Sequence, residues 1–223
     1  MRAKLSVIIP TLNAADDLAR SLPALAQGIQ AGLIRELVMS DGGSQDATLT
    51  IAEEAGAILV QGAPSRGGQL RRGAQEAKGE WLLFLHADTI LPPDWPDTVQ
   101  AQIAGGRSAC FRLRFDAGGL APLLVAGWAN LRTRLFHLPY GDQGLLISRR
   151  DYDSVGGYRD IPLMEDVAMA RALGRRLQVM PATVTTSAEK YRRDGWMRRG
   201  LRNLSLLLRY FSGVSPERLV RRY

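Results

Sequence analysis

Short apolar runs alternate with segments of helical periodicity through the first half of the chain. Each run is bounded by turn or polar residues, as is typical of a strand buried on both faces. The predicted strands are residues 4–10, 36–40, 57–61 and 81–86, and the predicted helices are residues 14–29, 45–56 and 67–79. Asn13 and Ser44 stand where they could cap the first two helices. This alternation predicts an α/β fold with a parallel sheet and right-handed crossovers.

The second half of the chain is less regular. Its predicted strands are residues 108–115 and 144–150, and its predicted helices are residues 120–138, with an apolar face, and 162–176. We find no internal repeat, low-complexity tract or linker, so the sequence is read as one domain.

Positive charge is concentrated at the C-terminal end. Residues 190–223 hold 10 of the 29 Lys and Arg residues and 2 of the 22 Asp and Glu residues, so they carry a net +8 and the rest of the chain −1. Residues 196–211 place leucines and aromatic residues at helical spacing among four arginines, which predicts a basic amphipathic helix. Packing on the core, contact with an anionic membrane surface and binding of a phosphorylated acceptor stay open. Because no nucleic-acid-binding motif accompanies the charge, we expect no nucleic-acid partner.

The composition, with 46% hydrophobic and 23% charged residues, is that of a soluble globular protein and excludes disordered and fibrous classes. Cys110 is the only cysteine, which excludes an intrachain disulfide and a cysteine-based metal site and fits a reducing cytosol. The chain shows no signal-type segment and no run of membrane-spanning length. We therefore expect a cytoplasmic protein, with peripheral contact at the inner face of the membrane left open.

Acidic residues stand at three element ends. Asp41 follows the second predicted strand, Asp88 follows the fourth, and the pair Glu165-Asp166 lies at the head of the last predicted helix. In a parallel sheet such ends face a ligand crevice. Carboxylate oxygens ligate divalent cations, and a further carboxylate can take a proton from a hydroxyl. The pattern therefore favours transfer of a group from a phosphate-bearing substrate held through a cation.

As a set, these segments resemble the family-2 glycosyltransferases of the GT-A fold. The likeness rests on VIIPTLNAADDL, MSDGGSQDAT, SRGGQLRRGAQEAKGEWLLFLHADT, GGY and PLMEDV, in this order from Leu5 to Arg176. A finer likeness, carried by GDQG, PLMEDV and the Arg-rich tail, is to the radical-SAM/selenodomain-associated transferase 2 branch, linked to arsenosugar biosynthesis. The resemblance implies one GT-A-like domain over residues 1–223. It comprises a nucleotide-binding half (1–105), an acceptor and catalytic half (106–189) and a basic helical tail (190–223).

The resemblance implies a donor site at the ends of the first two strands. In the family the Asp that matches Asp41 holds the base of a nucleotide-diphosphate sugar, with UDP or GDP as the leaving group. Gly42 stands where family members often have a second Asp, so Asp41 would carry more of this role. The turn after the first strand cradles base and ribose in the family, which assigns nucleotide binding to Pro10, Thr11 and Asn13.

The segment HADT implies a cation site, because family members usually carry Asp-x-Asp here and its last Asp binds Mg or Mn. The metal role transfers to Asp88, whereas His86 could ligate the metal, contact a phosphate or close the strand end. Arg66 precedes a Gly-Gly turn, where glycines let the backbone approach a ligand and a guanidinium can bridge phosphate oxygens. We therefore expect Arg66 to face the diphosphate and Mn or Mg to be the cofactor.

The family's Glu-Asp motif supplies the base, which assigns proton removal from the acceptor hydroxyl to Asp166 and orientation of the acceptor or loop to Glu165. In-line attack opposite the leaving diphosphate would invert the anomeric centre. The acceptor is expected to be a small or lipid-linked molecule. Residues 141–144, GDQG, fit a substrate-shaping turn and a plain turn equally well.

Three other functions stay open. A sugar-phosphate nucleotidyltransferase needs a Gly-rich phosphate loop with a basic residue after the first strand, where this chain reads PTLNAADD. A catalytically silent nucleotide-sugar binder or a membrane-associated scaffold stays open because His86 replaces the first Asp of the metal motif. The sequence also leaves the oligomeric state open.

Overall fold

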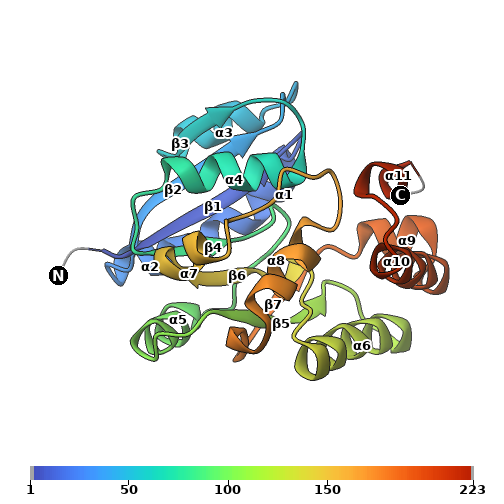
Figure 1. Ribbon diagram of the computed structural model, residues 1–223. Helices are drawn as coiled ribbons and strands as arrows, with labels where there is room; N and C mark the ends of the chain where they lie inside the picture. The colour runs from blue at the N-terminus through green and yellow to red at the C-terminus, as the bar shows by residue number, and fades with distance from the viewer. Residues whose placement is uncertain (1–2, 222–223) are drawn as a thin grey trace.

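Seven strands form one sheet in the computed structural model, which describes residues 3–221. The strands are β1 (Leu5–Thr11), β2 (Ile34–Asp41), β3 (Ile58–Gln61), β4 (Trp81–Phe84), β5 (Ala109–Phe115), β6 (Leu145–Ser148) and β7 (Gln178–Thr186). Their order in the sheet is β3-β2-β1-β4-β6-β5-β7 (Figure 1). β6 is antiparallel to its neighbours β4 and β5, and the other pairs are parallel. The predicted mostly parallel sheet is confirmed.

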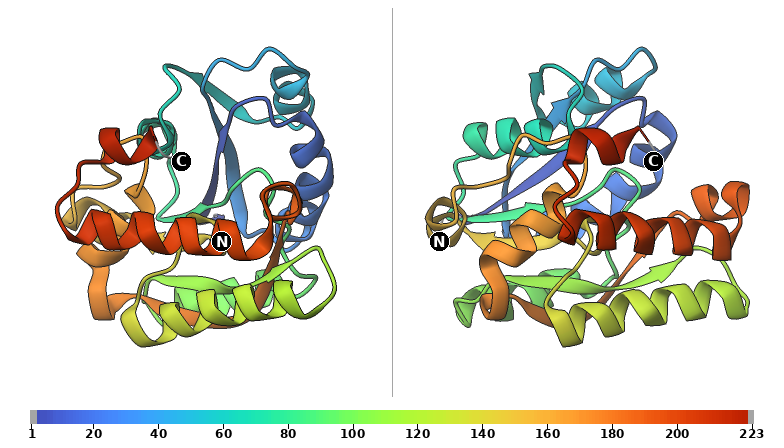
Figure 2. Two further views of the ribbon diagram at one scale, coloured as in Figure 1. Left: turned by 90° about the vertical axis from the view of Figure 1, so that its right-hand side faces the viewer. Right: turned by 45° about the vertical axis from the view of Figure 1, so that its right-hand side comes forward.

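Helices cover both faces of the sheet (Figures 1 and 2). Successive residues of a strand point to opposite faces, and in β1 Val7 and Ile9 join one core while Ile8 joins the other. The first core is closed by α1 (Ala15–Ser21), α3 (Thr48–Glu54), α5 (Trp95–Ala104) and α6 (Leu120–Phe136), and α2 (Ala26–Gln30) packs against α5. The second core is closed by α4 (Arg66–Glu76), α7 (Arg149–Ser154) and α8 (Glu165–Leu173).

The basic C-terminal segment is helical, as predicted. It forms α9 (Glu189–Asp194), α10 (Trp196–Phe211) and α11 (Pro216–Val220). α10 lies alongside α6, and Figure 2 shows the two helices one above the other. Leu206 and Leu207 of α10 pack against Val167 at the start of α8. Part of the tail therefore belongs to the core, and no helix within residues 3–221 is long and apolar enough to cross a membrane.

The first predicted helix, residues 14–29, is broken. α1 ends at Ser21, a 3-10 turn η1 (Leu22–Leu25) follows, and α2 begins at Ala26. The break comes at Pro23, which has no N–H to donate to the helix ladder. Two further 3-10 turns are η2 (Gly141–Gln143) and η3 (Gly174–Arg176).

The prediction that Asn13 and Ser44 cap helices is wrong, because the N-cap residues of α1 and α3 are Ala14 and Ala47. Asn13 Oδ1 instead accepts a hydrogen bond from Gln45 N at 2.8 Å, and Asn13 N donates to Ser44 Oγ at 2.8 Å. These bonds tie the β1–α1 loop to the β2–α3 loop, which keeps the two loops at the sheet edge together.

Candidate active site

The strand ends bring the predicted site residues to one edge of the sheet. All strands except β6 run in the same direction. The C-terminal ends of β1, β2 and β4 therefore lie at the same edge of the sheet as the N-terminal end of β6. Thr11 and Asp41 end β1 and β2, and are register partners. His86 and Asp88 follow β4. This edge is where open parallel sheets bind ligands.

Asp41 is fully buried and its carboxylate is saturated with hydrogen bonds. Oδ1 accepts from Thr11 Oγ1 at 2.9 Å and from Ser44 Oγ, and Oδ2 accepts from the backbone N–H groups of Gly43 and Ser44 at 2.7 and 2.8 Å. Burial alone would raise the pKa of Asp41, but the hydrogen bonds from Ser44, Gly43 and Thr11 lower it below its ordinary value. The contact of this carboxylate with the base stays a prediction, and the protein's own donors already occupy its acceptor positions.

Gln69 was missed from the sequence. Its buried amide Nε2 donates to the carbonyl oxygens of Thr11 at 2.7 Å and Ser40 at 3.0 Å, which joins the ends of β1 and β2. A Cβ on Gly42 would lie 3.2 Å from the Gln69 side chain. The sequence pattern that could have revealed Gln69 is a polar residue on the buried side of α4.

Arg66 links His86 to Glu165. Its Nη2 lies 3.2 Å from His86 Nδ1, and its Nε lies 3.5 Å from Glu165 Oε1. Burial, followed by the positive charges of Arg66 and Lys190, holds the pKa of His86 well below its ordinary value. The imidazole is therefore neutral, and because Arg can only donate, Nδ1 accepts and Nε2 carries the proton.

The second nitrogen of His86 is also enclosed. A Cβ on Gly141 would lie 2.4 Å from Nε2, so the turn before β6 packs directly on the ring. With Nδ1 facing Arg66 and Nε2 facing Gly141, the geometry argues against the metal-ligand alternative for His86. The ring instead sets the position of Arg66.

The glycines after Arg66 serve packing. A Cβ on Gly67 would lie 2.0 Å from the carbonyl oxygen of Arg159, and a Cβ on Gly68 would lie 2.6 Å from Asp160 Oδ1. Gly67 N donates to the carbonyl oxygen of Ile161 at 3.2 Å. The sequence suggested that these glycines admit a ligand, but they admit the segment that leads to Glu165.

The Glu165-Asp166 pair contains one buried and one accessible carboxylate. Glu165 is 1% exposed, and neither of its oxygens accepts a hydrogen bond from residues 3–221. Burial and the neighbouring Asp166 raise the pKa of Glu165 to about 7, while Arg66 acts in the opposite direction. Asp166 is half-buried, and its Oδ2 and Oδ1 accept from Gly141 N at 2.8 Å and Val167 N at 2.7 Å.

The backbone just before this pair is strained. Met164 has φ 67°, a left-handed conformation that costs a residue with a side chain about 1–3 kcal/mol. Such strain clusters at functional sites. The pair opens onto a pocket lined by Leu70, Phe84, Leu85, His86, Pro139, Tyr140, Gly141, Gly144, Leu145, Tyr158, Met169, Ala170 and Leu177.

Asp142 is a second residue that the sequence did not assign. It lies in η2, and its Oδ1 is buried without a hydrogen-bond partner. Burial raises the pKa of Asp142 to about 6, with repulsion from Asp88 and Asp166 adding to the effect and Arg132 and Arg66 opposing it. The GDQG turn thus places a carboxylate between the two other acidic positions.

Asp88 is half-buried, accepts no hydrogen bond from another residue among 3–221 and pairs with no cation there. Burial and, to a smaller extent, the negative charge of Asp17 raise the pKa of Asp88 above its ordinary value, although the positive charges of Lys190 and Arg66 act in the opposite direction. No group of three or more His, Cys, Asp and Glu side chains within residues 3–221 could hold a metal ion by itself. Mg²⁺ in proteins commonly takes one or two carboxylates and completes its shell with substrate phosphates and water. A cation at this edge would therefore need donors from a bound diphosphate in addition to the protein's carboxylates.

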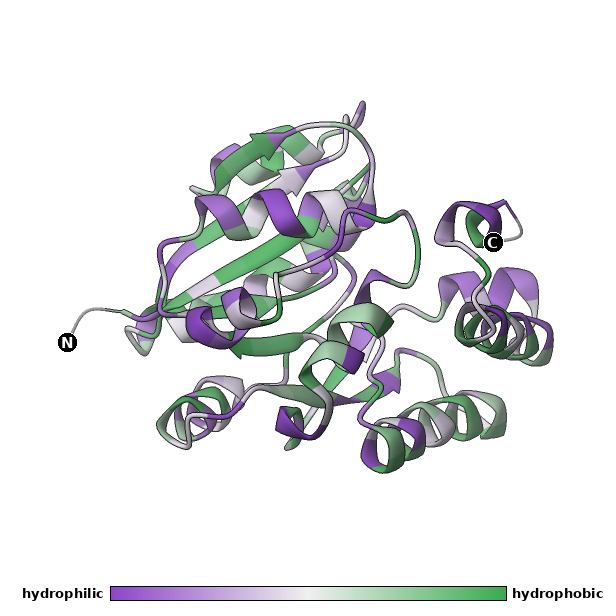
Figure 3. Ribbon diagram, in the orientation of Figure 1, coloured by the Kyte–Doolittle hydropathy of each residue, from purple (hydrophilic) through white to green (hydrophobic). Residues whose placement is uncertain are grey.

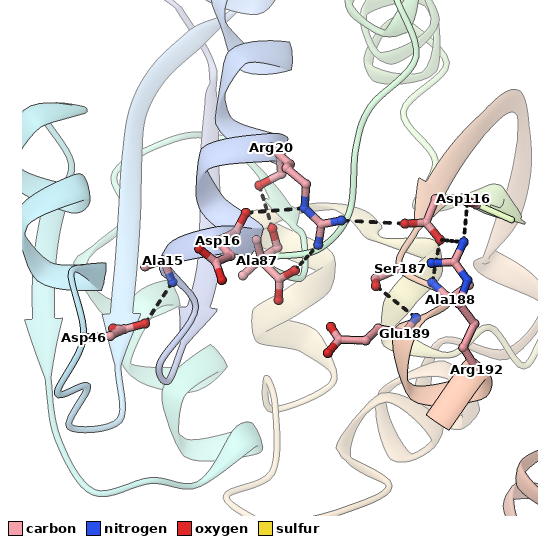
Figure 4. Close-up of polar contacts among 12 residues, drawn as sticks. Ala15, Asp16, Arg20, Asp46, Ala87, Asp116, Ser187, Ala188, Glu189 and Arg192 are labelled. Atoms are coloured by element: carbon pink, nitrogen blue, oxygen red, sulfur yellow. Dashed lines mark hydrogen bonds and ion pairs between the residues drawn. The ribbon is translucent and has the colours of Figure 1, made fainter. Parts of the chain in front are cut away.

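A polar network fixes the start of α9 near this edge (Figure 4). Asp116, just after β5, lies 3.7 Å from Arg20 Nη1 and accepts a hydrogen bond from Ala188 N at 2.7 Å. Arg192 Nη2 donates to the carbonyl oxygen of Asp116 at 3.0 Å. These contacts fix α9 against α1 and the end of β5, and place Lys190 within electrostatic reach of Asp88.

Comparisons with solved structures identify the fold. TarS of S. aureus superposes with a TM-score of 0.62 and 16% identity over 91% of this chain and 64% of that chain. The mannosyltransferase PcManGT from Pyrobaculum calidifontis, solved with GDP-Man and Mn2+, superposes with a TM-score of 0.63 and 16% identity, over 83% of this chain and 57% of that chain. Glucosyl-3-phosphoglycerate synthase from Mycobacterium tuberculosis, solved with Mn2+, uridine-diphosphate and phosphoglyceric acid, superposes with a TM-score of 0.56 and 21% identity, over 83% of this chain and 69% of that chain. The predicted GT-A fold is confirmed.

Sequence comparison identifies the family. The chain is 41% identical over 93 residues to the "PGL/p-HBAD biosynthesis glycosyltransferase" of Mycobacterium tuberculosis (strain ATCC 25177 / H37Ra) and of Mycobacterium bovis (strain BCG / Pasteur 1173P2), which covers 39% of this chain. It spans about a third, 36%, of the length of these relatives. The model of the family "Glycosyl transferase family 2" matches residues 6–124, more than half of the chain. The chain therefore belongs to glycosyl transferase family 2.

Proposed function

We propose that this protein transfers a sugar from a nucleoside-diphosphate sugar to an acceptor hydroxyl with inversion at the anomeric carbon. The observation that carries the proposal is the meeting of Asp88, Asp142 and Asp166 at one sheet edge, where Asp88 and Asp166 both raise the pKa of Asp142. A cation bound with the diphosphate would relieve the repulsion between these carboxylates, which Arg132 and Arg66 offset only in part. The family membership and the solved relatives with GDP-Man and uridine-diphosphate support a nucleotide-sugar donor.

The nucleotide would lie over the joined ends of β1 and β2. Pro10 and Asn13 reach solvent there, and Thr11 is buried. We propose that the backbone of this turn contacts the base and ribose, while Asp41 and Gln69 hold the turn in its conformation through their hydrogen bonds with Thr11. The donor is a UDP or GDP sugar.

The diphosphate would lie between β4 and α9. Asp88 and Asp142 would hold Mn or Mg, which supplies neutralisation of the charge that develops on the leaving diphosphate. Mn2+ in two of the solved relatives supports a divalent cation. Lys190 has no hydrogen-bond or ion-pair partner within residues 3–221 and would add a positive charge, and the partly exposed Arg66 would add another from the opposite side.

Asp166 would take the proton from the acceptor hydroxyl. It is the accessible member of the pair, and Gly141 N fixes its Oδ2 from one side. Glu165 is enclosed and faces Arg66, so its role would be to hold the guanidinium and the helix start in place. Attack in line with the departing diphosphate inverts the anomeric carbon and needs no covalent intermediate.

The test replaces Asp166 by Asn, which keeps the shape but cannot accept a proton. Release of nucleoside diphosphate from donor sugar in the presence of Mn should fall by roughly two to four orders of magnitude. Donor affinity, measured by titration calorimetry, should stay near that of the parent protein. Asp153→Asn, an exposed acid of α7, is the matched control and should leave the rate unchanged. A rate for Asp166→Asn within a factor of a few of the parent would contradict the role of Asp166.

A further inference from the structure

α6 turns its large apolar residues outward. The side chains that pack on the core are small, such as Ala126 and Ala129. On the opposite side, large apolar residues recur at helical spacing and are about half exposed or more. Leu120 is 79% exposed, Leu123 68%, Leu124 71%, Trp128 50%, Leu131 46% and Leu135 59%. Single exposed leucines are ordinary, but a continuous stripe over a whole helix marks an interaction surface.

α10 extends this surface. It lies beside α6, and it exposes Met197 by 71%, Leu201 by 62% and Leu208 by 57% at helical spacing. In Figure 3, α6 at the lower right is green over much of its length, and α10 beside it carries both green and purple segments. The outward faces of α6 and α10 are called the α6–α10 surface below.

The charges of the α6–α10 surface are all positive. Neither helix contains an Asp or Glu residue, and Arg134, Arg198 and Arg209 are exposed. Next to it, a pocket between α9 and α10 is lined by five cationic side chains and a single acid: Lys190, Arg193, Arg198, Arg199, Arg202 and Asp194. Apolar residues flanked by arginines complement acyl chains and anionic head groups.

We propose that the α6–α10 surface docks this protein on an anionic lipid bilayer. α6 would lie in the plane of the bilayer with its leucines and Trp128 among the head groups and upper acyl chains, and the arginines would face the lipid phosphates. A second copy of the chain would fit less well, because each copy would meet a surface whose charges are also all positive. The basic amphipathic segment foreseen in the sequence is half of this surface, and the larger apolar half is α6.

The docking does not depend on the proposed function, but it has a consequence for that function. Lys190 lines the cationic pocket and also lowers the pKa of Asp88. Lys190 therefore connects the candidate active site with the cationic pocket beside the α6–α10 surface. An acceptor hydroxyl on a lipid-linked molecule would be within reach of Asp166 in that arrangement.

The first test is co-sedimentation with vesicles of phosphatidylcholine alone and with about a third phosphatidylglycerol. The parent protein should bind the anionic vesicles, and raising salt from about 0.1 M to about 0.5 M should weaken binding. The combined change Leu124→Ser, Leu131→Ser and Leu135→Ser should lower the partition coefficient at least tenfold. Ile29→Ser is the matched control, because Ile29 is 65% exposed on α2, and it should bind like the parent.

The second test changes charge without touching the apolar stripe. Arg134→Gln, Arg198→Gln and Arg209→Gln together should weaken binding by about a hundredfold. The same change at three exposed arginines elsewhere, Arg107, Arg150 and Arg175, is the control and should matter much less. Fluorescence of Trp128 should be quenched by brominated lipids, and Trp128→Phe should remove most of that quenching.

Three results would overturn the proposal. The first is absence of parent binding to anionic vesicles at low salt. The second is equal binding by the triple Ser variant, after its circular dichroism and melting curve show a native fold. The third is a dimer in sedimentation velocity that the triple Ser variant dissociates while vesicle binding stays unchanged, which would assign the α6–α10 surface to a second copy.

Discussion

Glu165 is a buried carboxyl whose protonation changes near neutral pH. Burial and Asp166 raise its pKa from 4.5 to about 7. Between these values the folded state holds a proton that the unfolded state has lost, so the stability contributed by this group falls as pH rises through that window. Above pH 7 the cost levels off at about 3 kcal/mol.

We predict that Glu165→Gln raises the free energy of unfolding at about pH 8, by up to about 3 kcal/mol, and changes it little at about pH 5. At the lower pH the native carboxyl is already protonated and resembles the amide. Urea denaturation at both pH values measures the difference. Glu53→Gln, at an exposed acid of α3, is the control and should show little effect at either pH. An equal effect of Glu165→Gln at pH 5 and pH 8 would show that the carboxyl is ionised in the folded protein at both pH values, which would contradict the raised pKa.

The positions of the site residues could be predicted, but their bonding could not. Asp41, Asp88 and Glu165 lie at element ends where the strand pattern put them. The saturation of Asp41 depends on Thr11 of the neighbouring strand, and the Arg66 contact with Glu165 joins α4 to α8. Both arise from strand order and helix packing, which a single sequence does not specify.

At the scale of elements, α4 and the segment before α8 approach so closely that only glycine fits between them. Gly67 has no room for a Cβ, since Arg159 O would lie 2.0 Å away. We predict that Gly67→Ala destabilises the protein by about 2–4 kcal/mol, because backbone must shift to admit the methyl group.

Gly127→Ala is the matched control within α6. A Cβ there meets nothing within 4 Å, and Ala favours helix over Gly, so we predict a gain of about 0.5–1 kcal/mol. Thermal and chemical denaturation of the two variants give the comparison. Equal effects of the two substitutions would contradict the close approach of α4 and α8.

The strands buried on both faces were predictable, whereas β7 was not. Its residues alternate between buried and exposed, and Pro181 lies inside it. Proline usually ends a central strand, but β7 is the last strand of the sheet. Its outer side is bridged only at Thr185, by Ile90, among residues 3–221, so a missing N–H at Pro181 is tolerated. The edge position depends on the order of the whole sheet, so the local sequence could not reveal it.

At the scale of the whole molecule, the sheet edge, α9 and the α6–α10 surface lie in a row, in this order in space. The edge collects Asp88, Asp142 and Asp166, Lys190 stands beside it, and the cationic pocket continues toward α10. We predict a transferase that binds its donor through a cation at one end of this line and a lipid surface at the other.

The most direct test is a thermal-shift titration with UDP, GDP, CDP and dTDP, each with and without Mn, on the parent protein and on Asp88→Ala. A ligand that binds only the native state raises the melting temperature by mass action. We predict that UDP or GDP raises it only when Mn is present, and that Asp88→Ala keeps its fold but loses this rise, whereas the exposed-acid control Asp97→Ala keeps it. No rise with any nucleoside diphosphate, or an undiminished Mn-dependent rise in folded Asp88→Ala, would contradict the account.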